Sequence, residues 1–227
     1  ITRYPSNIKK ASPCGGKHKI VTTQLFASND PDTIPAVTEA IRHSQLIVLP
    51  TDTVYGVGAS AFDEEAIRSL FFVKQRSTKK GIPILIADEP DLEKIAARVP
   101  PIAEDLIARF WPGSLTLVLP KRKDLPPSIS ETESVAVRLP DHDVGREIIR
   151  AAGGTLATTS ANLSGHAAAQ TAREALDELA GTVAIVIDDG PSGGQMASTV
   201  VDCSGDTMRI LRPGPVTMDI LLEVVSL

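Results

Sequence analysis

Residues 46–61, LIVLPTDTVYGVGASA, join a short apolar run to a polar segment that contains two glycines. The run at 46–50 predicts a buried strand, because apolar runs of this length without alternation are typical of strands covered on both faces. We interpret residues 51–61 as a loop that follows this strand. Ligands bind beyond the carboxyl ends of strands in open α/β sheets, so the loop is a candidate binding segment.

Helices and short apolar strands alternate on both sides of this stretch. Asp63 is a capping residue before one helix, and Thr171 with Glu174 forms a capping box before another. No repeat or linker interrupts residues 31–227, so we expect a single α/β domain with a mixed sheet and flanking helices. The predicted helices cover about 32–44, 63–76, 90–98, 101–110, 143–152, 171–180 and 218 onward, and the predicted strands cover 83–87, 114–120, 134–140, 155–159, 183–187, 198–202 and 208–212.

The composition indicates a protein of the cytoplasm. At 227 residues and 42% hydrophobic content, the chain is long enough to bury a substantial core. No apolar run approaches the roughly 18 residues of a membrane helix, and no N-terminal segment resembles a secretion signal. Cys14 and Cys203 are the only cysteines, which favours a reducing compartment over a disulfide framework or a zinc knuckle. We expect no contact with a membrane.

The first 30 residues differ in charge from the rest of the chain. They carry five basic residues and one acidic residue, whereas the remainder carries 18 basic and 27 acidic residues. We expect residues 1–30 to form a flexible basic arm, as chain termini commonly do. The alternatives are the remnant of a targeting sequence, which would place the protein in an organellar matrix, and an arm that contacts RNA.

Residues 56–61, GVGASA, match the loose dinucleotide fingerprint G-x-G-x-x-A. That motif requires its first glycine immediately after a strand, whereas TDTVY intervenes here, so a Rossmann site is not favoured. The sequence has no Walker A loop, no G-x-S-x-G elbow and no H-E-x-x-H pair, and its four histidines are scattered. Neither a hydrolase nor a zinc enzyme is indicated.

Basic and hydroxyl side chains follow several of the predicted elements. Lys74 and Arg76 end a helix, where they either complement its dipole as a solvated cap or gather a polyphosphate. Arg138 ends an apolar strand, where a charge is costly without a partner, and a carboxylate or phosphate ligand would supply one. Ser160 and Asn162 can present a hydroxyl and an amide side by side. The pattern predicts an anion-binding cleft but does not identify a reaction.

Seven segments occur in the order and approximate spacing of the YrdC family of threonylcarbamoyl-AMP synthases: PTDTVYG, K-Q-R at 74–76, WPGSLTLVLP, VAVRLPDH, TTSANLSG at 158–165, ASTVVD and ILRPG. The chain resembles the single-domain form of this family from about residue 33 onward. The resemblance implies a twisted mixed sheet around a concave, basic cavity. It also implies a nucleotidyltransferase that makes threonylcarbamoyl-AMP from L-threonine, bicarbonate or CO2 and ATP, releasing pyrophosphate, for the modification of tRNA beside the anticodon.

The resemblance further implies partners and residue roles. Mg2+ is expected with the ATP phosphates, although no metal ligands are predicted. A separate threonylcarbamoyl transferase complex is expected to take the product, and contact with tRNA is left open. The implied catalytic residues are Lys74, Arg76, Ser160 and Asn162; ATP would be held by Arg76, Lys80, Ser134, Ser160, Asn162 and Arg212, and threonine by Thr53, Arg138, Thr158 and Ser198, with Arg138 meeting its carboxylate.

Two residues depart from the family pattern. The proline that often follows K-x-R is Ser77 here, and the histidine that many longer members place after the PILI-like strand is Ala87. The second change removes one threonine contact. Two alternative functions are a paralogue that forms a different acyl-adenylate and an RNA-binding module. The acidic remainder of the chain disfavours the RNA-binding module, because RNA binding depends on neutralising phosphates.

Overall fold

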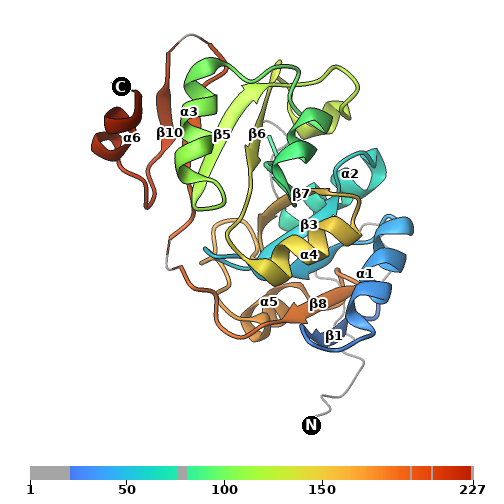
Figure 1. Cartoon of the computed structure of the whole chain (residues 1–227). Coiled ribbons are helices and arrows are strands. Elements are labelled where there is room, and N and C mark those ends of the chain that lie inside the picture. Colours follow the sequence, from blue (N-terminus) through green and yellow to red (C-terminus); the bar gives the residue numbers. More distant parts are fainter. Residues whose placement is uncertain (1–20, 76–80, 195, 206, 226–227) are drawn as a thin grey trace.

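The computed structural model describes residues 21–75, 81–194, 196–205 and 207–225 (Figure 1). Arg76, Ser77 and Lys80, together with residues 1–20 of the expected arm, lie outside these ranges. Within them, no helix has both the length and the apolar character needed to cross a bilayer.

The described residues form a ten-stranded sheet in the order β1-β8-β2-β3-β7-β4-β6-β5-β9-β10. Strand β8 pairs in parallel with β1 and β2, β4 with β6, and β5 with β9, whereas the remaining pairs are antiparallel. The predicted mixed sheet is therefore confirmed. The strands are β1 (Gln24–Ala27), β2 (Ile47–Leu49), β3 (Gly56–Ser60), β4 (Ile84–Ile86), β5 (Leu115–Pro120), β6 (Ser134–Arg138), β7 (Thr155–Ser160), β8 (Ile185–Asp188), β9 (Thr199–Asp202) and β10 (Arg209–Arg212).

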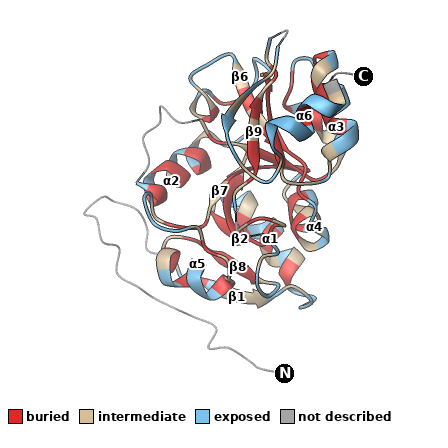
Figure 2. Cartoon of the chain, turned by 90° about the vertical axis from the view of Figure 1, so that its left-hand side faces the viewer, coloured by how far each residue is buried: buried red, intermediate tan, exposed pale blue. Residues whose placement is uncertain are grey.

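Helices cover both faces of this sheet. Those of the described residues are α1 (Thr33–Arg42), α2 (Glu64–Lys74), α3 (Pro101–Phe110), α4 (Asp143–Ala151), α5 (Ala172–Leu179) and α6 (Met218–Val225), with short 3-10 helices at Glu89–Lys94 and Pro127–Ile129. The inward sides of the helices and the strands between them are buried, while the outward sides of the helices are exposed (Figure 2).

Two hydrophobic cores lie on the opposite faces. Strand β2 contributes to both, because side chains alternate along a strand: Val48 belongs to the larger core, and Ile47 and Leu49 belong to the smaller one. Helices α2, α3 and α5 complete the larger core, and α1 with α4 completes the smaller one. The sheet between the two cores carries the segments that line the site described below.

Strand β3 corrects the expectation of a loop over residues 51–61, because Gly56–Ser60 are a strand between β2 and β7. Its glycines are needed for close packing against β7. A Cβ atom at Gly56 would lie 2.7 Å from the Thr158 methyl group, and one at Gly58 would lie 2.4 Å from Leu156 Cδ2. These glycines therefore serve a strand contact and not a phosphate loop.

Other boundaries also differ from the predictions. The arm was set too long, since Gln24–Ala27 pair with β8 and Thr23 is buried, so the folded part of the chain begins before residue 30. The helix expected over 90–98 is only a 3-10 helix, Glu89–Lys94.

The predicted helix starts agree better with the structure. Asp63 accepts hydrogen bonds from Glu65 N and Ala66 N at the start of α2. Thr171 Oγ1 accepts from Glu174 N as a capping box requires. The returning bond differs by one residue, because the Glu174 carboxylate accepts from Gln170 N.

Candidate active site

A cavity of about 210 Å³ lies beside β3 and β7. Its walls come from the segment between β2 and β3, from the last residues of β6, β7 and β10, and from the segments that lead into β4 and β9. Six of the predicted site residues line it: Thr53, Arg138, Thr158, Ser160, Ser198 and Arg212. The fold thus brings these six residues to one cavity, and their role in binding anions stays a prediction.

Arg138 is the most buried cation of the cavity, at 5% exposure. Its Nε donates to Gly113 O at 2.8 Å and its Nη1 donates to Thr53 Oγ1 at 2.9 Å. Its Nη2 donates to the carboxylate of Asp52, so a protein carboxylate supplies the partner that the sequence left open. Burial lowers the pKa of Arg138, and Asp52 opposes this effect. An arginine remains charged under these conditions.

The Thr51 side chain fixes the segment that holds Asp52 and Thr53. Its hydroxyl donates to Val54 O at 2.7 Å and accepts from Thr53 N at 3.2 Å, which closes a tight turn. Gly194 packs on the other side of this turn, where a Cβ atom would lie 2.7 Å from Thr53 Cα. The contacts of Arg138 are therefore made to a backbone that is held from both sides.

Ser198 and Arg212 lie together in another part of the cavity wall. Arg212 donates from Nε and Nη2 to Ser198 O at 3.1 and 2.8 Å, and Nη2 also reaches Ser198 Oγ at 3.1 Å. Within the part of the chain that the structure describes, no carboxylate lies within ion-pair distance of Arg212. Arg212 is also close enough to Arg138 to lower the pKa of that group by charge repulsion. The cavity therefore has two cations and one compensating carboxylate.

Lys74 and Asn162 hold the backbone that ends at the cavity. The Lys74 ammonium is buried and donates to Ser160 O at 2.5 Å, to Asn162 Oδ1 at 2.8 Å and to Asn162 O. Ser160 Oγ donates to the same Oδ1 at 2.5 Å. Neither Lys74 nor Asn162 lines the cavity, whereas Ser160 does. Lys74 and Asn162 therefore position the loop 160–162.

The remaining predicted residues are separate from the cavity or lie outside the described ranges. Ser134 begins β6, half-buried and opposite Pro120, about 13 Å along the strand from Arg138. Arg76 and Lys80 were both predicted to hold ATP and lie outside the described residues. Ala87, the departure from the family pattern, is fully buried in the smaller core.

The sequence analysis assigned no role to several residues that shape the site. Asp52 lacked a signal because its partner is 86 residues away. Thr116 lines the cavity from β5 and pairs with Ser198, yet it stands in a strand that reads as ordinary core. Tyr55 Oη donates to Gly190 O at 2.6 Å and joins the segment 51–55 to the chain before Ser198. Burial raises the pKa of Tyr55 to about 12.

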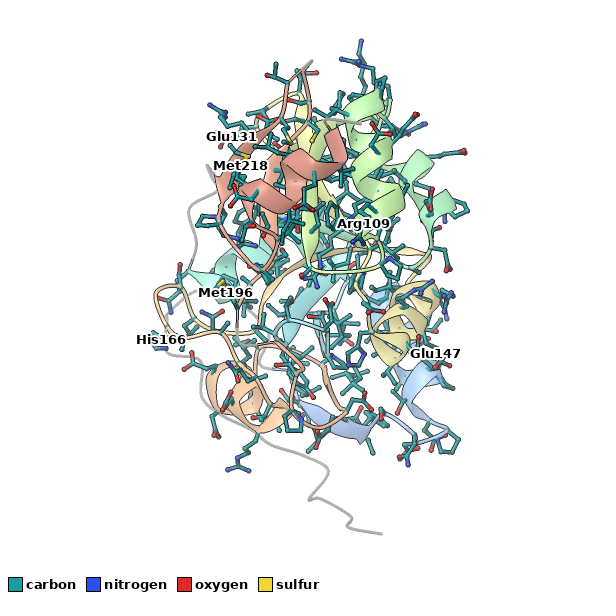
Figure 3. The ribbon with its side chains drawn as sticks, turned by 60° about the vertical axis from the view of Figure 1, so that its left-hand side comes forward. Arg109, Glu131, Glu147, His166, Met196 and Met218 are labelled. Atoms are coloured by element: carbon teal, nitrogen blue, oxygen red, sulfur yellow. The ribbon has the colours of Figure 1, made fainter. Side chains whose placement is uncertain are left out.

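The loop 160–166 is also tied to helix α5. Glu178 accepts from Leu163 N at 3.0 Å and pairs with the His166 ring at 2.9 Å. Figure 3 shows His166 at the outer side of the molecule, in agreement with its exposed side chain. The hydrogen bond with His166 is the main cause that lowers the pKa of Glu178.

The described residues do not include an activated cysteine thiol or a cluster of metal ligands. Burial raises the pKa of Cys203 to about 11, which keeps this thiol protonated and unreactive. The described ranges contain no group of three or more His, Cys, Asp or Glu side chains that could hold a metal ion. Mg2+ commonly keeps waters and binds through substrate phosphates, so a protein cage is not required for it. The cavity is suited to hold anions by cations and hydroxyl groups.

The family model of the Sua5, YciO and YrdC proteins, described as telomere recombination, matches residues 39–214. The chain belongs to this family. A threonylcarbamoyl-AMP synthase of Bacillus subtilis is 37% identical over 206 residues, 90% of this chain and 59% of that protein. A threonylcarbamoyl-AMP synthase of Vibrio cholerae is 31% identical over 186 residues, 81% of this chain and 98% of that protein.

A solved structure gives the same result for the fold of this YrdC-family protein. The crystal structure of P. abyssi Sua5 complexed with L-threonine has a TM-score of 0.84 and 34% identity, and the match covers 89% of this chain and 60% of that one. The chain thus spans about 60% of the B. subtilis and P. abyssi proteins and nearly all of the V. cholerae protein. The α/β fold that the resemblance implied is confirmed.

Proposed function

We propose that this chain is a threonylcarbamoyl-AMP synthase. The observation that carries the proposal is the buried Arg138 fork in a cavity of amino-acid size, in a member of a family whose named relatives are such synthases. The cavity volume of about 210 Å³ lies below the roughly 300 Å³ at which pockets for drug-sized ligands begin. It suits a small amino acid, and a nucleotide would extend beyond it.

Arg138 retains hydrogen-bonding capacity for a carboxylate. A guanidinium has five N–H donors, of which three are used by Gly113 O, Thr53 Oγ1 and Asp52. One N–H on each terminal nitrogen has no acceptor among the described residues. Two such donors match the two oxygens of a carboxylate. We therefore assign the threonine carboxylate to Arg138.

The other proposed threonine contacts follow once the threonine carboxylate is placed on Arg138. Thr53 and Thr158 supply hydroxyl oxygens beside the fork, and Thr158 Oγ1 keeps lone pairs because it donates to Leu156 O. Pro83, Leu85 and Ala197 provide apolar wall for a methyl group. Threonine carries both a hydroxyl and a methyl on Cβ, so its hydroxyl can bond to the polar side of the cavity while its methyl packs against the apolar side.

The reaction needs positioning more than a protein nucleophile. The threonine amine attacks CO2 derived from bicarbonate. The attack forms a C–N bond, and the nitrogen loses a proton to give a carbamate. A carbamate oxygen then attacks the α-phosphorus of ATP, and pyrophosphate leaves with the electrons of the broken P–O bond. Holding three reactants in line supplies much of the rate, and cations stabilise the charge that develops on phosphate.

ATP is proposed to extend from the cavity toward the start of β6. Ser160 and Arg212 contact the cavity, and Ser134 lies about 13 Å from Arg138 along β6, a separation that a nucleotide can span. Arg76 and Lys80 follow α2 and would meet the phosphates. Lys74 and Asn162 are assigned to holding the loop 160–162. We expect Mg2+ to enter with the ATP phosphates.

The product is expected to pass to a separate transferase that modifies tRNA. This partner and a location where tRNA is modified follow from the proposed activity, which does not itself require direct contact with tRNA.

An assay with labelled threonine, bicarbonate, ATP and Mg2+ tests the proposal. Threonylcarbamoyl-AMP and pyrophosphate are expected in equal amounts, with no product when threonine or bicarbonate is omitted. ATP turnover that ignores both omissions would overturn the assignment. Turnover with carbamoyl phosphate in place of threonine and bicarbonate would indicate the paralogue instead.

A further inference from the structure

Thr116 and Ser198 form a buried hydroxyl pair in the wall of the cavity. Their oxygens are 2.7 Å apart, and the residues are 2% and 4% exposed. They come from neighbouring parallel strands, since Thr116 lies in β5 and Ser198 immediately precedes β9. Both residues line the cavity. The pair is therefore presented to a bound ligand.

A count of protons shows that the pair has one donor left over. Each hydroxyl has one proton, and the bond between Thr116 and Ser198 uses one of the two, whichever oxygen donates. Arg212 Nη2 donates to Ser198 Oγ and so uses one of its lone pairs. The second hydroxyl proton has no acceptor among the described residues. A buried donor without an acceptor is destabilising, so this proton is available to bind an oxygen of a ligand.

The charge around the pair specifies what kind of oxygen fits. Asp52 compensates Arg138, while Arg212 has no carboxylate partner within the described ranges and contacts Ser198 directly. The Nη1 group of Arg212 also has no acceptor there. A hydroxyl proton beside an uncompensated guanidinium favours an oxyanion over a neutral carbonyl.

The position of the pair identifies the oxyanion, given the proposed function. Ser198 was expected on the threonine side and Arg212 on the ATP side, and the two residues are in contact. The only group that joins threonine nitrogen to the α-phosphorus is the carbamate. We infer that Thr116, Ser198 and Arg212 form the subsite for the carbamate, with the free hydroxyl proton donated to its oxygen. Bicarbonate enters the reaction at the same place.

Binding linkage and steady-state kinetics test this subsite with Thr116→Val, Ser198→Ala and the double variant. Each single variant retains one hydroxyl that can donate, so the KM for bicarbonate is expected to rise only several-fold. The double variant loses both donors, and its KM for bicarbonate is expected to rise about 10- to 100-fold, the range for a hydrogen bond to a charged group. Thr116→Ser keeps the hydroxyl and is expected to behave as the wild type.

Two controls separate this effect from a loss of folding. Thr155→Val makes the same substitution at a buried threonine of β7 that does not line the cavity, and it should leave the KM for bicarbonate unchanged. In the proposed subsite, Ser198 is reassigned from threonine to the carbamate. Threonine affinity, measured by calorimetry without bicarbonate, should therefore change less than about threefold in the double variant, in which Arg138 is intact. An equal loss of threonine affinity would overturn the subsite, as would a bicarbonate KM within twofold of the wild type.

The same calorimetry keeps the inference separate from the proposed function. Bicarbonate is expected to tighten threonine binding in the wild type and to have no such effect in the double variant. If the wild type shows this linkage but forms no threonylcarbamoyl-AMP, the subsite stands and the synthase assignment fails. If product forms but the double variant keeps the linkage, the subsite is overturned and the synthase assignment stands.

Discussion

Arg138 and Asp52 form an ion pair at the wall of the cavity, with side chains that are only 6% and 17% exposed. The carboxylate neutralises the guanidinium in the absence of ligand and fixes one of its terminal nitrogens. It also places a negative charge next to the position assigned to the threonine carboxylate. The pair therefore stabilises the empty protein and opposes the substrate at the same time.

Asp52→Asn is expected to destabilise the ligand-free protein and to strengthen threonine binding. The amide oxygen still accepts from Arg138, so the fork keeps its orientation, but the buried positive charge loses its compensation. Breaking a buried pair costs about 3 kcal/mol or more. Thermal unfolding with and without threonine measures both effects: the variant should have a lower Tm alone and a larger threonine-induced rise.

Asp88→Asn is the matched control, because Asp88 also pairs with arginines, Arg146 and Arg150, away from the cavity. Its threonine-induced rise in Tm should equal that of the wild type. Loss of the rise in Asp52→Asn would mean that the charge of Asp52 is needed to orient Arg138, contrary to this expectation.

Arg138→Lys is expected to weaken threonine binding by about 100-fold. Lysine keeps the charge but lacks the fork, so the two donors proposed for the carboxylate are lost, at about 1.5 kcal/mol or more each. The KM for ATP should change little. Substrate-dependence curves measure both constants, and a KM for threonine within tenfold of the wild type would contradict the assigned contact.

Lys74→Ala is expected to reduce stability as well as turnover. The ammonium is buried and donates to three oxygens of residues 160 and 162, so its removal leaves acceptors in the interior without a donor. A loss of about 2–4 kcal/mol is expected from this mechanism. Urea unfolding measures it. Full stability with lost turnover would instead indicate that Lys74 contacts a substrate directly.

Glu178→Gln is expected to flatten the pH dependence of stability below pH 5. The hydrogen bond with His166, followed by that with Leu163 N, lowers the pKa of Glu178 in the folded protein. Its contribution is therefore fully present above the unfolded value of about 4.3 and is lost as the pH falls through the folded value. Urea unfolding at pH 5 and pH 3 should give a smaller difference in the variant.

Glu104→Gln on the first turn of α3 serves as the control for that experiment, because this residue is exposed and distant in sequence from the loop 160–166. Its difference between the two pH values should match that of the wild type. An unchanged difference in Glu178→Gln would show that the carboxylate does not hold the loop.

The sequence predicted most of the sheet and the side chains that face the cavity, because periodicity and capping are local signals. It predicted Thr53, Arg138, Thr158, Ser160, Ser198 and Arg212 as site residues, and the fold brings them to one cavity. Their roles remain proposals.

Partnerships between distant residues were not predictable in this way. Asp52 meets Arg138 across 86 residues, and Thr116 meets Ser198 across 82. Strand β3 was missed because glycine is unfavourable in strands generally and is selected here by close contact with Thr158 and Leu156. Strand β1 was missed because the basic residues that precede it made the first 30 residues resemble a terminal arm, although the strand pairs with the distant β8.

The contact of Gly56 with the Thr158 methyl group has a consequence for engineering. Neither Gly56 nor Gly58 can be exchanged for a larger residue without pushing β3 away from β7, so the floor of the cavity is fixed in shape. A variant designed to accept a bulkier amino acid is therefore better altered at Pro83, Leu85 or Ala197, which form the apolar wall. The range of amino acids that the proposed threonine site accepts is thus set by the apolar wall and not by the strand beneath it.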